Sequence, residues 1–184
     1  MFPVLNTERL SLRPPRANDI DDLFALFSDP RITEVWSHEA WTERAQAESL
    51  LQNIVAKAQS GELFQWAITL AGVDRLIGTA TLSAVDHRHR HCMIGYALMP
   101  SHQGKGYARE AAGALIRHAF TGLQLHRIGA DLEPDNAGSR KLLEAFGFQV
   151  EGRLRDTYWL NGRWYDSLIM SLLESDWRAR QSPA

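Results

Sequence analysis

The first sixty residues alternate apolar and polar positions in one stretch and repeat apolar positions at helical spacing in two others. Residues 8–13 read E-R-L-S-L-R, with leucines on one side and polar residues on the other, as a half-buried strand requires. Apolar residues then recur every three or four positions from Asn18 or Asp19 to Pro30, and again over residues 43–60. The pattern predicts one strand followed by two helices.

The middle of the chain carries three strand patterns and then a helix. Residues 64–70 and 76–84 are rich in apolar and β-branched residues, and the short Gly-containing segment between them predicts a hairpin. Strand character resumes over residues 93–99 and ends at Pro100. Residues 106–120 then place alanines and other apolar residues on one helical face. Such small side chains let a helix lie close to a sheet.

The last third alternates strands with one more helix. Residues 127–133 alternate apolar and acidic positions, which predicts a strand with one acidic face. Residues 134–147 form a helical pattern that ends at a glycine, and residues 148–155 and 164–172 form two strands around an Asn-Gly turn. The predicted order is β-αα-βββ-α-β-α-ββ, a mixed α/β fold.

Composition narrows the function less than the pattern does. The chain has 184 residues, 45% of them hydrophobic, and no repeat or linker, so we expect a single domain over residues 1–184 with its core at about 8–175. A formal net charge of −2 gives no indication of a nucleic-acid partner. The N-terminus shows no export signal, and no apolar run approaches the length of a membrane span. We therefore expect a cytoplasmic protein with no membrane partner.

A glycine-rich turn connects the third predicted strand of the middle region to the helix that follows. The turn reads Gln103-Gly104-Lys105-Gly106-Tyr107-Ala108. Free backbone amides and the positive end of the helix dipole make an anion site at such a position, and glycines let a ligand approach the backbone. Neither the Walker pattern nor the dinucleotide pattern matches. These residues alone leave two readings open, a pyrophosphate site and a surface turn that caps a helix.

The turn and three other segments resemble the GNAT acetyltransferases. Residues 103–108 match the motif Q/R-x-x-G-x-G/A, and residues 133–148 are similar to a second cofactor segment, N-x-x-S before a helix that ends in G-F. Residues 7–14 and 164–166 resemble the branch that contains the ribosomal-protein N-terminal acetyltransferases. The resemblance covers nearly the whole chain. It implies a single-domain GNAT fold, with a mixed, mostly antiparallel sheet and helices on both faces.

The resemblance also implies acetyl-CoA as co-substrate and assigns residues to it. Backbone amides of the turn would hold the pyrophosphate, and free amides at Leu98 and Met99 would hold the pantetheine arm and the acetyl carbonyl. Asn136 would contact the cofactor arm, although a helix N-cap is its alternative reading. The cofactor residues implied are Leu98, Met99, Gln103, Gly104, Lys105, Gly106, Tyr107, Ala108, Asn136 and Ser139.

Acetyl transfer also needs a proton for the departing thiolate. By resemblance Ser139 supplies it, and its alternative reading is a solvent-facing helical serine. Many members of the family use a tyrosine one helical turn further on, where this chain has Leu143. That departure raises the weight on Ser139, or on a tyrosine of the last strands, Tyr158 or Tyr165.

Candidate bases and acceptor contacts are carboxylates and aromatic residues. Asp131 and Glu133 project from one face of the same strand and could draw a proton from the amine through water, or they could be an exposed charged face. Glu34, Tyr158 and Tyr165 are the candidate substrate-binding residues. An α-amine, with a pKa near 8, would need only a weak base, whereas lysine, near 10.4, would need a stronger one.

Residues 87–92 read H-R-H-R-H-C and are the strongest candidates for a metal site. Alternate histidines share one side of a strand, but the arginines between them add positive charge, so a solvated hairpin is the preferred interpretation. We expect no metal. The aromatic residues of the last hairpin could line the acceptor entrance or form the contact of a homodimer.

The resulting hypothesis is an N-acetyltransferase that transfers acetyl directly to a primary amine, best the N-terminal α-amine of a protein or peptide such as a ribosomal protein. The runner-up acceptor is a small amine, such as a polyamine, an amino acid or an antibiotic. The third reading is a non-catalytic acyl-CoA-binding module, which Leu143 favours.

Overall fold

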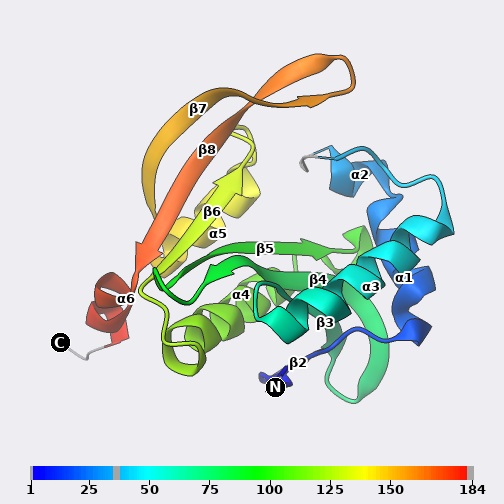
Figure 1. The fold of residues 1–184 in the computed structure, drawn as a ribbon, viewed down its shortest axis with the longest axis horizontal. Coiled ribbons are helices and arrows are strands. Elements are labelled where there is room, and N and C mark those ends of the chain that lie inside the picture. Colours follow the sequence, from blue (N-terminus) through cyan, green and yellow to red (C-terminus); the bar gives the residue numbers. More distant parts are fainter. Residues whose placement is uncertain (1, 35–37, 182–184) are drawn as a thin grey trace.

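The computed structural model describes residues 2–34 and 38–181, and it centres on one twisted sheet (Figure 1). The sheet has eight strands in the order β1-β2-β3-β4-β5-β6-β8-β7. All neighbours are antiparallel except β5 and β6, which are parallel. The strands are β1 (Leu5–Asn6), β2 (Leu10–Arg13), β3 (Phe64–Leu70), β4 (Val73–Asp86), β5 (His91–Leu98), β6 (Arg127–Leu132), β7 (Gln149–Leu160) and β8 (Arg163–Leu173).

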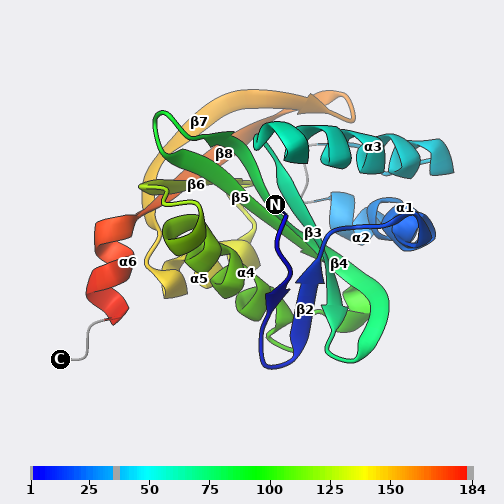
Figure 2. The same ribbon diagram turned by 60° about the horizontal axis from the view of Figure 1, so that its bottom comes forward.

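Helices cover both faces of this sheet, as Figure 2 shows. On one face lie α1 (Ile20–Phe27) and α3 (Arg44–Ser60), with the single turn α2 (Pro30–Thr33) beside them. On the other face lie α4 (Tyr107–Arg117) and α5 (Ala137–Phe146). The last helix, α6 (Glu174–Gln181), follows β8 directly and packs Trp177 against Phe120. The described chain thus has three layers, as its alternating apolar patterns require.

The sequence predicts the order of the main elements correctly and misses short ones. The predicted helix over residues 106–120 ends at Arg117 and continues as a π-helical turn, η3 (His118–Gly122). The strands predicted over residues 148–155 and 164–172 are longer, so the last hairpin reaches well beyond the body of the sheet (Figure 1). The mixed, mostly antiparallel α/β architecture with helices on both faces is confirmed.

Two apolar cores hold the layers together. The larger lies between the sheet and the helices α4 and α5, where Ala111, Ala112, Leu115 and Ile116 are at most 1% exposed. The smaller lies between the sheet and α1, α2 and α3. Alanines at the contact let α4 approach the sheet closely, as the small-residue stripe predicts. This close approach fixes where the start of α4 meets the end of β5.

A buried ion pair connects β2 to the start of α1. Arg13 donates from Nη1 to Asp19 Oδ2 at 2.7 Å and from Nη2 to Oδ1 at 2.8 Å, and both side chains are less than 8% exposed. Asp19 also accepts from the backbone amide of Arg16 at 2.7 Å. The sequence predicts Asp19 as a helix cap, but its carboxylate accepts no hydrogen bond from α1. It binds Arg13 and caps the preceding 3-10 turn η1 (Ala17–Asp19) instead. The pair therefore fixes the crossing from sheet to helix.

Breaking this pair should destabilise the protein strongly. Asp19→Asn removes the bidentate partner of a buried guanidinium and leaves it only the Asp74 carboxylate, so the free energy of unfolding should fall by about 3 kcal/mol. Asp21→Asn is the matched control, because Asp21 pairs with Arg44 at 2.7 Å with its side chain 80% exposed, and such a pair contributes about 1 kcal/mol or less. Urea unfolding measures both. Equal losses in the two variants would contradict the assignment.

Candidate functional site

The strands β5 and β6 diverge after a short parallel contact. They pair at only three positions, His91 with Arg127, Cys92 with Ile128 and Met93 with Gly129. Beyond Met93 each strand keeps its antiparallel partner on the outer side, β4 for β5 and β8 for β6. Figure 1 shows the two strands together near α6 and separating away from it. The second half of β5 therefore has an edge open to a gap inside the sheet.

Backbone amides on this open edge alternate in direction. Met99 donates its amide hydrogen to the carbonyl of Ile77 at 2.9 Å, toward β4. Leu98 turns the other way, and its carbonyl accepts from the side chain of Gln103 at 2.9 Å. Because neighbouring residues of a strand point their amides to opposite sides, the amides of Leu98 and Tyr96 face the gap. The expectation of a free amide thus fits Leu98, and for Met99 it is wrong.

A cleft of about 910 Å³ opens where the strands diverge. Its walls come from β5, the glycine-rich turn, β6, the first half of α5 and the hairpin of β7. The sequence-predicted residues that line it are Leu98, Gln103, Gly104, Gly106, Tyr107, Ala108, Asp131, Glu133, Asn136, Ser139 and Tyr158. Residues from predicted segments that lie far apart in the sequence therefore meet in one cleft. Met99, Lys105, Glu34 and Tyr165 do not belong to its lining.

The glycine-rich turn has the backbone that an anion site requires. Gly104 and Gly106 have φ values of 72° and 81°, in the left-handed region that favours glycine, and Gly106 is the N-cap of α4. No atom lies within 4 Å of where a Cβ of Gly104 would stand. Lys105 turns away, because its ammonium donates to the carbonyl of Ser101 at 2.8 Å. The first-turn amides of α4 therefore face the cleft with the positive end of the helix dipole.

A clamp from the N-terminal strands fixes this turn, and we define it as Thr7, Arg9 and Glu110. Glu110 accepts from Thr7 Oγ1 at 2.6 Å, from the Arg9 amide at 2.8 Å and from Arg9 Nε at 2.7 Å. Arg9 also donates to the carbonyl of Lys105 at 3.0 Å. Burial raises the pKa of Glu110, but the bonds from Thr7 and Arg9 outweigh it and leave this pKa below its usual value. Glu110 is therefore an ionised anchor for α4.

Residues 7–14 enter the family resemblance only as a similar segment, and the sequence alone assigns no role to Thr7 or Arg9. The signal that could have found them is the acidic residue in the first turn of α4, whose half-buried carboxylate needs a partner somewhere in the chain. The partner's position is set by the docking of β1 and β2. A local pattern does not contain that information.

The start of α5 places Asn136 and Ser139 in the cleft. Asn136 is the N-cap of α5, and its side chain accepts from the Ser139 amide at 3.0 Å. The alternative reading of Asn136 as a cap is therefore confirmed, while its side of the helix still lines the cleft. Ser139 is partly buried and lines the cleft.

The structure adds one residue that the sequence did not suggest, Tyr96 on β5. It lines the cleft beside Ser139, and its hydroxyl oxygen is buried without a hydrogen-bond partner of good geometry. Burial raises the pKa of Tyr96, and the nearby Ser139 hydroxyl lowers it by less. A tyrosine inside an apolar strand pattern reads as core, which is why the pattern gave no signal.

Acidic and aromatic side chains form the far wall of the cleft. Asp131 is exposed and Glu133 is half-buried at the end of β6, and both face Tyr158 of β7. Burial raises the pKa of Tyr158, and the charge of Glu133 raises it further. Tyr165 stacks on Tyr158 with ring centroids 5.2 Å apart, so it supports the wall from behind. Glu34 is exposed outside the lining, and residues 35–37 of the same loop lie outside the described residues.

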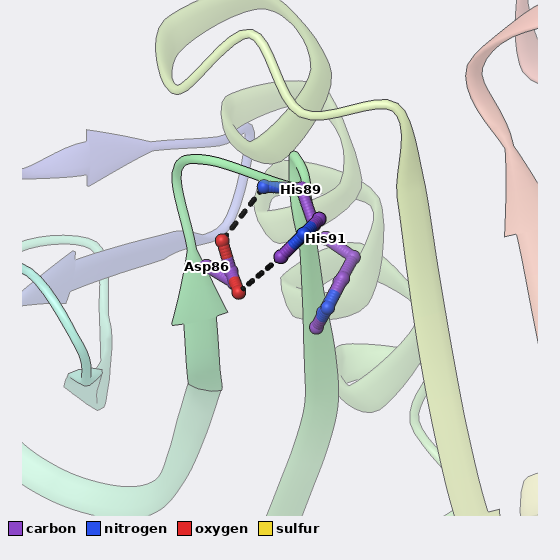
Figure 3. Close-up of side chains that lie close together, drawn as sticks. All are labelled: Asp86, His89 and His91. Carbon is purple, nitrogen blue, oxygen red and sulfur yellow. Dashed lines mark hydrogen bonds and ion pairs between the residues drawn. The ribbon is translucent and has the colours of Figure 1, made fainter.

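The histidine-rich turn lies at the other end of β5. Figure 3 shows Asp86, His89 and His91 together, with their candidate ligand atoms within 4.8 Å of one another. Asp86 accepts from the His89 amide at 2.7 Å and from His89 Nδ1 at 2.9 Å, which holds the pKa of Asp86 at about 2. Cys92 is buried, and burial raises the pKa of its thiol to about 12. Hydrogen bonds thus join Asp86 to His89, and the His91 ring stacks on that of His89 with ring centroids 6.3 Å apart.

Within the part of the chain that the structure describes, no helix is long and apolar enough to cross a membrane.

Comparison with known proteins gives the same result at the level of sequence. The family described as Acetyltransferase (GNAT) domain matches residues 9–149. The uncharacterized N-acetyltransferase YoaA of Bacillus subtilis is 36% identical over 95% of this chain and 98% of its own. The [ribosomal protein uS5]-alanine N-acetyltransferase of Escherichia coli is 33% identical over 65% of this chain and 62% of its own.

Comparison of structures agrees. The crystal structure of spermidine N-acetyltransferase from Vibrio cholerae in complex with CoA and spermine superposes with a TM-score of 0.84 at 27% sequence identity. The match covers 94% of this chain and 99% of that one. The two proteins therefore share the same fold.

Loosening the clamp should weaken both the fold and the cleft. Glu110→Gln removes a charge that accepts from Thr7 and Arg9, and such bonds contribute about 1.5–3 kcal/mol each, so unfolding free energy should fall by about 2 kcal/mol. Coenzyme A should bind about tenfold more weakly, because the turn loses its anchor. Glu144→Gln, which breaks an exposed pair with Arg140 on α5, is the control. Unchanged calorimetric affinity in Glu110→Gln would contradict the clamp.

Chelation should leave the protein unaffected. The Asp86 carboxylate already accepts two hydrogen bonds from His89. EDTA dialysis should therefore leave the unfolding temperature unchanged and change the coenzyme A dissociation constant by no more than about twofold. Zinc titration by calorimetry checks this directly, with His89→Ala as the comparison. Submicromolar zinc binding that disappears in His89→Ala would show a metal site.

Proposed function

The chain belongs to the GNAT acetyltransferase family and is an N-acetyltransferase, and from this we propose that its acceptor is the N-terminal α-amine of a protein or peptide. Ribosomal proteins are the best single class. The observation that supports the proposal is the cleft between β5 and β6, which joins an anion-binding turn to a wall of acidic and aromatic side chains. Each part meets one requirement of direct acetyl transfer.

Acetyl-CoA fits the cleft from the turn inward. The amides of residues 104–108 suit the pyrophosphate, since they lie in the turn that begins α4. The gap-facing amide of Leu98 suits the pantetheine arm and the acetyl carbonyl, where it would stabilise the developing oxyanion. The CoA complex of the Vibrio cholerae spermidine enzyme supports this co-substrate.

Direct transfer assigns the remaining roles to residues of the wall. Asp131 or Glu133 would take a proton from the incoming amine through water, and Ser139 would protonate the departing thiolate. The two acids, at the end of β6, and the serine, in the first turn of α5, line the same cleft. A positioned amine attacking an aligned carbonyl gains rate mainly from proximity, so neither a metal nor a covalent enzyme intermediate is needed.

Charge at the acceptor side suits a cationic amine. Arg31 of α2 lines the cleft but is paired with Asp29, so Asp131 and Glu133 set the charge of that wall. A neutral fraction of about a tenth at pH 7 makes an α-amine a workable nucleophile for a weak base. The similarity to the uS5-alanine enzyme supports this acceptor class.

The runner-up is a small amine such as a polyamine, an amino acid or an antibiotic. The shared fold with the spermidine enzyme supports it, as does a relative from the same organism, spermidine N(1)-acetyltransferase, which is 28% identical over 94% of this chain. The non-catalytic reading that Leu143 favours loses its basis, because the chain belongs to a family of N-acetyltransferases.

Two further parts of the proposal concern the setting. We place the reaction in the cytoplasm, on the sequence alone. We also propose a homodimer through the β7–β8 hairpin, whose Trp159 and Trp164 are each 56% exposed at its end. Analytical ultracentrifugation of the wild type would show the dimer.

An acceptor screen tests the proposal. Free-N-terminus peptides, the same peptides with blocked N-termini and an internal lysine, spermidine and free amino acids are each incubated with acetyl-CoA, and thiol release and product mass are measured. Peptides with a free N-terminus should react at least tenfold faster at pH 7 than any other acceptor in the screen. Their rate should rise toward pH 8 as the amine loses its proton. Faster acetylation of spermidine would move the assignment to the runner-up.

Ser139→Ala should lower kcat about 10²-fold while coenzyme A affinity stays within about twofold, because only the departing thiolate loses its donor. Ser101→Ala, a control on the exposed 3-10 turn η2 (Pro100–His102), should retain its kcat. Wild-type kcat in Ser139→Ala would exclude the serine as the acid.

A further inference from the structure

The Tyr96 hydroxyl is a buried hydrogen-bond donor without a use in the fold. Its ring packs against the larger core, while its oxygen lies in the cleft with no accessible surface and no partner of good geometry. An unpaired hydroxyl in this position costs folding free energy, and a phenylalanine would fill the same space without that cost. Such a group in a cleft points to a ligand or to a role in the reaction.

Its neighbourhood specifies the role. Tyr96 stands on the strand edge whose amides face the gap, and its hydroxyl lies beside that of Ser139 at the start of α5. One helical turn beyond Ser139, Leu143 lines the same part of the cleft and is 2% exposed. Ser139 therefore has an apolar neighbour on its own helix, and Tyr96 brings a second hydroxyl to it from the opposite strand.

We propose that Tyr96 and Ser139 form a two-hydroxyl relay, in which Tyr96 donates its hydrogen to Ser139 Oγ while Ser139 donates its own to the coenzyme A sulfur. This inference rests on the proposed function of Ser139. Tyr96 acts through Ser139, so it is a positioning residue and a proton source. The relay solves a chemical difficulty, because a serine that gives up its proton alone becomes an alkoxide, a far stronger base than a phenolate.

The proton balance closes with water as the only co-reactant. The amine nitrogen forms its bond to the acetyl carbon, and the carbon–sulfur bond breaks with its electron pair on sulfur. The Ser139 proton moves to sulfur and the Tyr96 proton moves to Ser139, and the buried Tyr96 phenolate then regains a proton from cleft water by way of Ser139. The amine loses one proton to water through Asp131 or Glu133, so the gain and loss are equal. Burial raises the pKa of Tyr96, which keeps the phenol protonated before each turnover.

Tyr96→Phe, Ser139→Ala and the double variant test the relay. Tyr96→Phe should lower kcat 10- to 100-fold in the peptide reaction and leave the coenzyme A dissociation constant within twofold. In the Ser139→Ala background the same change should have no further effect, because the two residues act as one unit. The urea midpoint of Tyr96→Phe should be equal to or higher than that of the wild type, whereas loss of a tyrosine hydroxyl with a purely structural role would lower the midpoint.

Thr69→Val is the matched control, since it removes a buried hydroxyl that bonds the Ser11 carbonyl at 3.0 Å outside the cleft. It should lower the urea midpoint and leave kcat unchanged. A second measurement follows the protons themselves. In single-turnover experiments the rate should depend on the deuterium fraction of the solvent along a curve in the wild type and along a straight line in Tyr96→Phe.

The outcomes separate the two proposals. Wild-type kcat in Tyr96→Phe, or independent losses that multiply in the double variant, would overturn the relay and leave the acetyltransferase assignment of Ser139 intact. A wild-type protein that releases no thiol with any amine of the screen would overturn the proposed acceptor chemistry and the relay together.

Discussion

The separation of β5 from β6 is the constraint on which the site depends. Parallel pairing at three positions holds the two strands together, and the outer partners β4 and β8 then hold them apart. Amides that would normally satisfy one another across a sheet are left for a ligand. The same gap admits side chains from α5 and from the β7–β8 hairpin, so that the residues proposed to contact the cofactor and the acceptor line one cleft.

A second constraint is the position of α4, whose start must meet the end of β5 with its amides uncovered. The alanine face of α4 sets its distance from the sheet, and the clamp of Thr7, Arg9 and Glu110 sets its rotation and its register along the sheet. Packing alone would tolerate a helix that slides, whereas a carboxylate with three donors does not. Apolar burial and charged hydrogen bonds thus have different tasks in one helix.

The sequence predicts what local chemistry determines. Gly61, Gly147 and the Asn161-Gly162 turn end their elements in the left-handed backbone that their residue types favour, and the glycine-rich turn follows the same logic. Partners that lie far apart in the sequence cannot be predicted from local patterns. Asp19 satisfies the rule for a helix cap but binds Arg13, the Met99 amide pairs with Ile77, and Tyr96 looks like any core aromatic until α5 brings Ser139 beside it. Those roles arise from tertiary docking.

The clamp also bears on the order in which the protein assembles. Glu110 accepts hydrogen bonds from Thr7, which lies 103 positions earlier in the chain, and from Arg9, which lies 101 positions earlier. These bonds therefore close one of the longest loops in the described structure. Contacts of such separation form late, after the sheet has brought the N-terminal strands beside α4. The proposed affinity of the turn for coenzyme A would thus be a property of the finished chain. Any nascent or clipped form without its first strands would have no clamp and would bind coenzyme A more weakly, however well its central sheet had formed.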